Sequence, residues 1–144
     1  MRISAIIITR DEAANIADCL ASVAFCDERI VIDCGSSDDS TELDTQFPAI
    51  NMLRLPHHLG AARAMNIATR TAKAELLFFV SPNVEVAPET VTALADRLQP
   101  DSEAPETEVA AVCPLLVDPE GNPASRIHPI PTRAELQAAA RGVE

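Results

Sequence analysis

Apolar runs rich in β-branched residues alternate along the chain with segments whose apolar residues recur at helical spacing. The run ISAIIIT is long enough for a buried strand, and after it Ile16, Leu20 and Val23 recur as on one face of a helix. The pattern predicts strands at residues 3–9, 29–33, 51–55, 75–80 and 109–118, and helices at 10–25, 41–47, 59–72 and 88–98. Strands that alternate with helices form βαβ units, so we expect an α/β fold with three layers, α/β/α, around a mostly parallel sheet.

The last third of the chain carries different signals. Residues 99–108 are acidic and contain two prolines, which is typical of a surface loop, and residues 118–122 (DPEGN) have the composition of a turn. After Pro123 the chain is rich in proline, and Thr132 with Glu135 forms a capping box that predicts a helix over residues 131–142. We therefore expect an α/β domain at residues 1–122, followed by a proline-rich segment and a helix at 123–144.

Composition narrows the classes of partner. The 144 residues are 47 % apolar, which predicts a globular fold, but only 3 % are aromatic and there is no Trp or Tyr to stack on bases. The net charge of −11 opposes binding to nucleic acid or to an anionic membrane. A small anionic ligand remains compatible with this charge where arginines or a metal ion offset it locally.

The cysteines and the N-terminal run bear on location. The four cysteines form no CxxC pair and have no metal-ligand spacing, so we interpret them as reduced thiols of a cytoplasmic protein. The first apolar run is followed by Arg10, Asp11 and Glu12 where a signal peptide would need a cleavage site. We therefore interpret that run as a strand, with no signal peptide and no integral membrane segment.

The candidate site follows from the topology. In parallel α/β sheets, ligands bind beyond the carboxyl ends of the strands. Those ends are residues 9–11, 33–36, 56–58 and 81–83.

Asp33 and two arginines are the clearest candidates within these segments. Asp33 precedes a Gly-Ser-Ser turn and can accept a hydrogen bond from a base N–H or a ribose hydroxyl, although the same residues can simply end a strand and cap a helix. Arg63, in the first turns of a predicted helix, can meet a diphosphate as a planar donor, or it can lie exposed along that helix. Arg10 carries the same two interpretations.

Three segments in order resemble a known family. SAIIITRDEAANIADCLASV, IVIDCGSSDDST and HLGAARAMNIATRTAKAELLFFVSPNVEVAPETV look like the N-terminal part of family 2 glycosyltransferases, and AAVCPLLVDPEGNPASRIHPIPT resembles rhamnosyltransferase-like members. The match covers about residues 3 to 130, and its strength lies in the ordered set, because no single motif is specific. It implies the GT-A fold of nucleotide-diphospho-sugar transferases, with a Rossmann-like sheet, and makes residues 1–122 a nucleotide-sugar-binding domain.

The resemblance also implies roles at individual positions. Thr9 and Arg10 match the end of the first strand, which lines the nucleotide pocket, and Asp33 matches an acid that contacts base or ribose. Arg63 matches a basic residue that faces the donor. Ser81-Pro82-Asn83 matches the Asp-x-Asp motif or its Asn-Pro-Asp variant, whose acids hold Mg²⁺ or Mn²⁺ against the donor diphosphate.

Two departures from the family bear on activity. Ser81 and Asn83 are neutral, whereas Mg²⁺ prefers carboxylate oxygens, so metal binding by this turn is in doubt. Glu85 is an alternative ligand if the strand continues, because it would then share a face with Asn83. Family members also continue past this length into an acceptor half with an acidic general base, and residues 123–144 contain no such acidic motif, so the chain resembles a truncated family domain.

Two hypotheses of different classes follow. The first is a glycosyltransferase that moves a sugar from a nucleotide-diphospho-sugar donor to an unknown acceptor. The second is a degenerate nucleotide-sugar-binding or assembly module, working as a homo-oligomer that covers the surface of the absent half. A nicotinamide-binding Rossmann protein is disfavoured because no GxGxxG follows the first strand.

Overall fold

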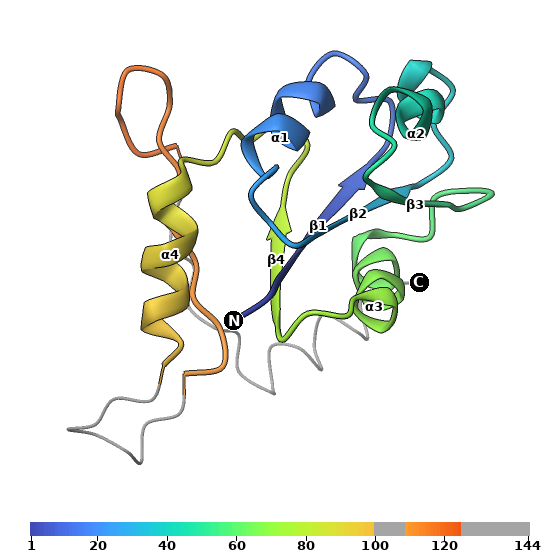
Figure 1. The fold of residues 1–144 in the computed structure, drawn as a ribbon. Coiled ribbons are helices and arrows are strands. Elements are labelled where there is room, and N and C mark those ends of the chain that lie inside the picture. Colours follow the sequence, from blue (N-terminus) through green and yellow to red (C-terminus); the bar gives the residue numbers. More distant parts are fainter. Residues whose placement is uncertain (100–108, 125–144) are drawn as a thin grey trace, which may run out of the picture. The chain divides into compact units, whose positions relative to one another are not determined.

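The computed structural model describes residues 1–99 and 109–124, and the chain divides into two compact units, Met1–Val112 and Cys113–Glu144. The elements of the first unit alternate as the sequence predicts (Figure 1). In chain order they are β1 (Ile3–Thr9), α1 (Ile16–Ser22), β2 (Glu28–Asp33), the 3₁₀ helix η1 (Asp39–Glu42), α2 (Leu43–Gln46), β3 (Asn51–Arg54), α3 (Ala61–Thr71), β4 (Leu76–Val80) and α4 (Pro88–Arg97).

The four strands form one parallel sheet in the order β3-β2-β1-β4. The central strand β1 pairs on one side with β2, where Thr9 is the register partner of Asp33, and on the other with β4, where Ile7 is the partner of Val80. All four strands therefore end at the same edge of the sheet. This arrangement confirms the predicted α/β class and the parallel sheet.

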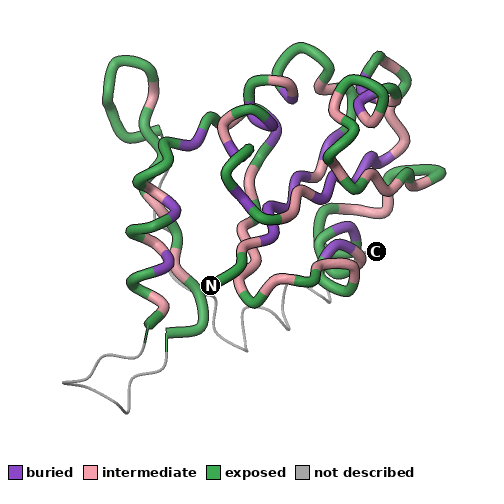
Figure 2. Tube along the Cα trace, in the orientation of Figure 1, coloured by how far each residue is buried: buried purple, intermediate pink, exposed green. Residues whose placement is uncertain are grey.

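Each face of the sheet has its own buried cluster, because successive side chains of a strand point to opposite faces. On one face, α1, α2 and α4 cover β1 and β2, and the buried residues are Ala5, Ile7, Ile16, Cys19, Leu20, Val23, Cys26, Val31, Leu43, Val86 and Val91. On the other face, α3 packs its small residues against the sheet, and the cluster is Ile6, Ile30, Ile32, Cys34, Ala64 and Ala68. The buried positions concentrate along β1 and β2 (Figure 2). The three-layer prediction is confirmed.

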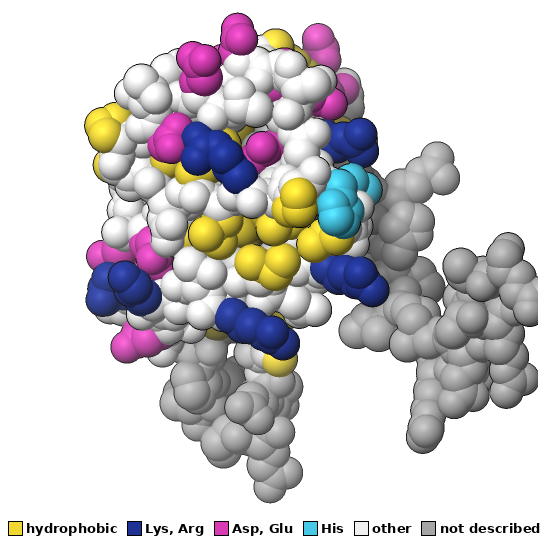
Figure 3. Space-filling view, turned by 90° about the vertical axis from the view of Figure 1, so that its right-hand side faces the viewer, with side chains coloured by type: hydrophobic (Ala, Val, Ile, Leu, Met, Phe, Trp, Pro, Cys, Tyr) yellow, Lys and Arg dark blue, Asp and Glu magenta, His cyan; other side chains and the backbone are white. Residues whose placement is uncertain are grey.

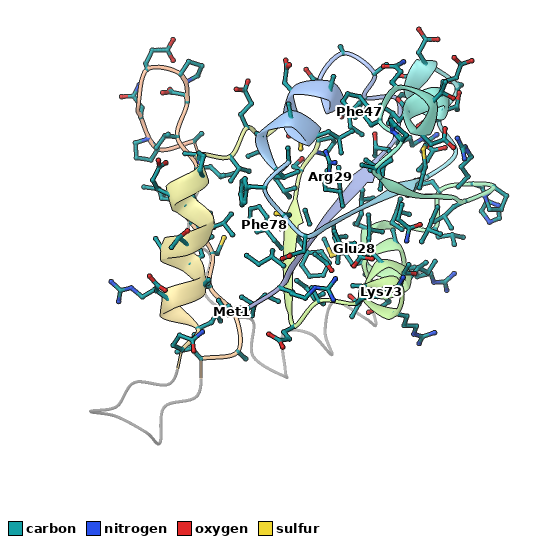
Figure 4. The ribbon with its side chains drawn as sticks, in the orientation of Figure 1. Met1, Glu28, Arg29, Phe47, Lys73 and Phe78 are labelled. Carbon is teal, nitrogen blue, oxygen red and sulfur yellow. The ribbon has the colours of Figure 1, made fainter. Side chains whose placement is uncertain are left out.

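A polar cluster ties the amino-terminal edge of the sheet together. The Glu28 carboxylate accepts hydrogen bonds from the Ser4 hydroxyl at 2.6 Å and from the Lys73 amide at 3.0 Å, and the Ala74 amide donates to the Ser4 oxygen at 3.3 Å. Glu28 and Lys73 lie at this edge in Figure 4. Desolvation acts to raise the pKa of Glu28, but these hydrogen bonds and the nearby Lys73 charge lower it below its usual range. These hydrogen bonds connect β1, β2 and the start of β4, so the cluster has a structural role.

One predicted element is wrong in extent, and another does not form among the described residues. The helix predicted at 10–25 spans only Ile16–Ser22. Asp11 and Glu12 belong to a loop, and their amides donate to Ser36 in the loop after β2 and to Ser40 in η1. The strand predicted at 109–118 does not form among the described residues, which contain only an isolated antiparallel bridge between Val117 and Pro123. Pro114 interrupts this apolar run and has no N–H to donate to a ladder. The predicted turn at 118–122 is present, with Gly121 N donating to Asp118 O at 2.9 Å.

Other predictions fall on residues outside the described ranges. They are the acidic loop after residue 99 and the capped helix at 131–142 with Thr132 and Glu135. The domain boundary between residues 122 and 123 also stays a prediction. Within the described part of the chain, no helix combines the length and apolar character needed to cross a bilayer.

The thiols differ sharply in environment. Cys19, Cys26 and Cys34 are buried and Cys113 is exposed. Desolvation raises the pKa of Cys19 and of Cys26 to about 11, and it also raises the pKa of Cys34, which lies next to the Asp33 carboxylate. A raised pKa removes the reactive thiolate at neutral pH.

We predict that a disulfide reagent such as DTNB at pH 8 labels Cys113 rapidly and the three buried thiols only after urea unfolding. Cys113→Ala removes the fast phase and serves as the control. Fast labelling of a second thiol in the native protein would contradict the burial that the structure shows.

Candidate functional site

Thr9 and Asp33 meet at the carboxyl edge of the sheet, as the sequence predicts. They are register partners at the ends of β1 and β2, and the Cys34 amide donates to the Thr9 carbonyl at 2.9 Å. Both side chains are buried, with Thr9 1 % and Asp33 3 % exposed. The Thr9 hydroxyl is the only buried side-chain oxygen or nitrogen of the described residues without a hydrogen-bond partner. An unpaired buried hydroxyl carries a free-energy cost. Its position next to a buried acid therefore marks this end of the sheet as a candidate ligand site.

Only one oxygen of the Asp33 carboxylate accepts hydrogen bonds from the described residues. Its Oδ1 accepts from the Ser36 amide at 3.0 Å and from the Ser36 hydroxyl at 2.5 Å. Among the described residues nothing donates to Oδ2, so this oxygen keeps its capacity to accept a hydrogen bond. The carboxylate therefore has one oxygen free of hydrogen bonds from the described residues, while the other closes its own turn.

Two loops that are distant in sequence hold each other around this point. From the loop between β1 and α1, the Asp11 amide donates to Ser36 Oγ at 3.0 Å, and Asp11 Oδ1 accepts from the Ser37 amide at 2.7 Å. The Ala13 amide donates to Asp38 Oδ2 at 3.0 Å. Asp38 also accepts from the hydroxyl and amide of Ser40, and these bonds, led by the Ser40 hydroxyl, lower the pKa of Asp38.

The backbone conformation of Asp11 is linked to this pairing of the two loops. Asp11 has a φ of 55°, the only positive φ of a non-glycine residue in the described chain. Such a conformation costs free energy in an L-residue and persists where surrounding bonds enforce it. The Ser37 hydrogen bonds to the Asp11 side chain supply that enforcement.

The turn that follows β4 is closed by its own side chains. The strand ends at Val80, the Val84 amide donates to the Ser81 carbonyl at 3.1 Å, and the Ser81 hydroxyl donates to Asn83 Oδ1 at 2.7 Å. The Cys19 thiol of α1 donates to the Ser81 carbonyl at 3.4 Å. The expectation that Glu85 shares a face with Asn83 required the strand to continue through these residues. Because the strand ends at Val80, this requirement is not met.

Asn83 and Glu85 nevertheless line one small hollow of about 60 Å³. Asn15, Asp18 and Cys19 of the α1 region form its opposite wall. Within residues 1–99 and 109–124, however, no group of three or more His, Cys, Asp or Glu side chains is placed to hold a metal ion. The Asn83 oxygen is already engaged by Ser81, so these side chains alone do not fit a divalent ion, and we derive no step that depends on one.

An apolar groove of about 280 Å³ lies on the other side of the same turn. Its lining comes from β1, the start of α3, and β4 with the turn after it: Ile6, Ile8, Ala61, Met65, Phe79, Val80, Ser81 and Pro82. Met65 and Phe79 are about two fifths exposed, at 39 % and 42 %. Figure 3 shows apolar side chains gathered across one face of the molecule, with charged side chains of both signs and His around them.

The two candidate arginines are less defined. The Arg10 side chain follows Thr9 and is 55 % exposed, and among the described residues its one ion pair is a long one, 3.8 Å from Asp11. Arg63 lies exposed in the first turn of α3. The structure therefore gathers Thr9, Arg10, Asp33, Ser81 and Asn83 at one edge of the sheet, while the place of Arg63 in the site stays a prediction.

Sequence reasoning placed Asp11 and Ser36 in the candidate segments but did not predict that Asp11 bonds to Ser36 or that Ser36 bonds to Asp33. Their side chains look like helix-capping residues when they are considered one segment at a time. The available signal was indirect: a turn serine three residues after an acid is spaced to bond back to it. The partnership with Asp11, 25 residues earlier, had no local signature.

The comparison with known families decides the identity of the fold. A family model described as "Glycosyl transferase family 2" matches residues 4–133. The chain belongs to glycosyl transferase family 2. Its parallel sheet in the order β3-β2-β1-β4 is the GT-A nucleotide-diphospho-sugar transferase fold, as the resemblance of its segments implied.

Solved structures of other proteins share this family 2 fold. A mannosyltransferase from Pyrobaculum calidifontis, in complex with GDP-Man and Mn²⁺, has a TM-score of 0.62 and 23 % identity, over 67 % of this chain and 32 % of that one. Residues 1–349 of S. aureus TarS give 0.59 and 23 %, over 68 % and 33 %. Glucosyl-3-phosphoglycerate synthase from Mycobacterium tuberculosis, in complex with UDP, gives 0.57 and 23 %, over 67 % and 39 %. The family 2 chain thus matches between 32 % and 39 % of these proteins.

The unpaired Thr9 hydroxyl leads to a stability prediction. Thr9→Val keeps the shape and removes the hydroxyl, so we expect the unliganded protein to gain on the order of 1 kcal/mol in free energy of unfolding. Urea unfolding monitored by circular dichroism measures it.

The matched control is Thr41→Val, because the Thr41 hydroxyl is paired with the Asp38 carbonyl at 3.1 Å. That variant should lose stability. A loss of stability in Thr9→Val would show that its hydroxyl is satisfied in solution.

Proposed function

We propose that this family 2 domain binds the nucleotide part of a nucleotide-diphospho-sugar donor at the carboxyl edge of its sheet, and that it serves sugar transfer to an acceptor. The observation that carries the proposal is the Asp33 carboxylate, whose Oδ1 is fixed by Ser36 and whose Oδ2 accepts no hydrogen bond from the described residues. In an α/β sheet of this topology the carboxyl edge is the ligand-binding edge. Family membership supplies the class of donor.

Each side chain has a role that its chemistry allows. Oδ2 of Asp33 is an acceptor for a base N–H or a ribose hydroxyl, and the Thr9 hydroxyl is a donor or acceptor that gains a partner when a ligand reaches it. Thr9 is closed off from solvent, so that contact requires a small movement of the two loops beside it. The guanidinium groups of Arg10 and Arg63 offset the diphosphate charge in an otherwise acidic chain.

A divalent ion belongs to this proposal only through the donor. The mannosyltransferase of similar fold was solved with GDP-Man and Mn²⁺, and the glucosyl-3-phosphoglycerate synthase was also solved with Mn²⁺ and UDP. Here Ser81 and Asn83 offer neutral oxygens, so Mg²⁺ or Mn²⁺ would take most of its ligands from the diphosphate and water.

The direct test is calorimetry with UDP-, GDP- and dTDP-sugars, with and without Mn²⁺. We expect saturable binding of at least one of them, and Asp33→Asn should weaken it roughly tenfold or more because a charged acceptor is lost. Asp39→Asn, which removes an exposed carboxylate nearby, is the matched control and should bind as wild type. Absence of binding to all three donor classes would refute the proposal for this chain.

A second candidate function is a degenerate module that binds the nucleotide-sugar without transferring the sugar, or that acts in assembly as a homo-oligomer. The observation that favours it is the turn after β4, where Ser81 and Asn83 bond to each other and carry no charge. Sugar transfer measured together with a monomeric mass in light scattering would rule this candidate out. Nucleotide binding with no turnover for any acceptor would favour it.

The neutral turn yields its own prediction. Ser81 and Asn83 are both exposed, so the double variant Ser81→Asp with Asn83→Asp should fold normally. It restores two carboxylates at the position of the family motif, and we expect Mn²⁺ to strengthen nucleotide binding in the variant more than in the wild type. Calorimetry with and without Mn²⁺ measures the difference. Asn83→Ser, which adds no charge, should show no such gain.

A further inference from the structure

Ser36 stands between two acidic residues in a way that fixes the direction of its hydroxyl proton. Its Oγ lies 2.5 Å from Asp33 Oδ1, and it accepts the Asp11 amide proton at 3.0 Å. An ionised carboxylate can only accept, so the hydroxyl proton points to Asp33. The chain of donors runs from the Asp11 backbone through Ser36 to the Asp33 side chain.

We infer that Ser36 is a positioning residue that holds the Asp33 carboxylate in the orientation needed to meet a nucleotide, and that Asp11 in turn orients Ser36. The inference rests on the proposed function, because it assigns to Ser36 an action on the group that contacts the donor. It adds a residue that itself touches neither sugar nor phosphate.

The geometry explains why the hydroxyl matters beyond the backbone bond. Oδ1 accepts both the amide and the hydroxyl of Ser36, and the charge-assisted O–H bond is the shorter of the two. Two donors on one oxygen hold the Asp33 side chain in one χ1 rotamer, with Oδ2 free of hydrogen bonds from the described residues. With only the amide left, the Asp33 side chain can populate other χ1 rotamers, and part of the binding free energy then goes into ordering it.

Asp11 and Ser37 explain how the donor chain is itself held. The positive φ of Asp11 directs its amide to Ser36, and the Ser37 amide and hydroxyl bond to Asp11 Oδ1 at 2.7 and 3.1 Å. Ser37 is adjacent to Ser36 but bonds to Asp11 and not to Asp33. Ser37→Ala keeps the shorter amide bond to Asp11 and removes only the longer hydroxyl bond, so it is the matched control within the same loop.

The experiment measures binding of the UDP-, GDP- or dTDP-sugar that wild type binds most tightly. Ser36→Ala should weaken it roughly tenfold, the equivalent of one charge-assisted hydrogen bond, while Ser37→Ala stays within about threefold of wild type. Ser36→Thr, which keeps the hydroxyl, should restore most of the affinity. In an Asp33→Asn background, Ser36→Ala should have little further effect, because both changes act through one carboxylate.

Wild-type affinity in Ser36→Ala, or an equal loss in both backgrounds, would overturn the inference and leave the proposed function standing. A second measurement does not need a nucleotide: three-bond NMR couplings across χ1 of Asp33. They should report one rotamer in wild type and in Ser37→Ala, and an average in Ser36→Ala. If wild type binds no nucleotide-sugar, the proposed function fails, and unchanged couplings in Ser36→Ala would overturn the positioning role as well.

Discussion

The pairing of β1 with β2 is the constraint on which both the core and the site depend. Both strands are buried on their two faces, so alternate side chains of each enter different clusters. Because the side-chain period is two, a slip of one residue in this pairing would exchange the two faces of a strand and bury the wrong set. The same register sets Thr9 opposite Asp33 at the end of the ladder. The apolar core thus determines the position of the polar site.

Where the sequence predicted the fold correctly, the signal was local. The apolar runs of the four strands and the helical spacing of α3 and α4 need no knowledge of distant partners. The start of α1 was predicted too early because Asp11 and Glu12 suit a helix N-terminus, yet their amides bond to serines 25 and 28 residues away. In the run at 109–118, apolar content suggested a strand, but Pro114 and the absence of a ladder among the described residues decided otherwise.

The candidate site shows the same contrast between local signals and contacts that the sequence does not specify. Thr9, Asp33 and the turn after β4 were predictable because strand ends in a parallel sheet converge, and their convergence needs only the strand positions. The side-chain pairing of Ser81 with Asn83 and the engagement of Asp33 by Ser36 depend on rotamers that no pattern of residue types specifies. Arg63 illustrates a further limit: an exposed side chain on a helix has many accessible positions, so sequence and backbone together do not place its charge.

Gly35 allows the loop that carries Ser36 to pack closely against the loop after β3. Its φ is +78°, and a Cβ at this position would lie 3.2 Å from the His57 Cα, so the backbone between β2 and η1 rests directly against the backbone between β3 and α3. With no side chain between the two main chains, neither segment can change its course without displacing the other. Residues 34–37 and 56–58 therefore act as one structural unit. A graft or redesign of this edge of the domain has to transfer both segments together or leave both unchanged.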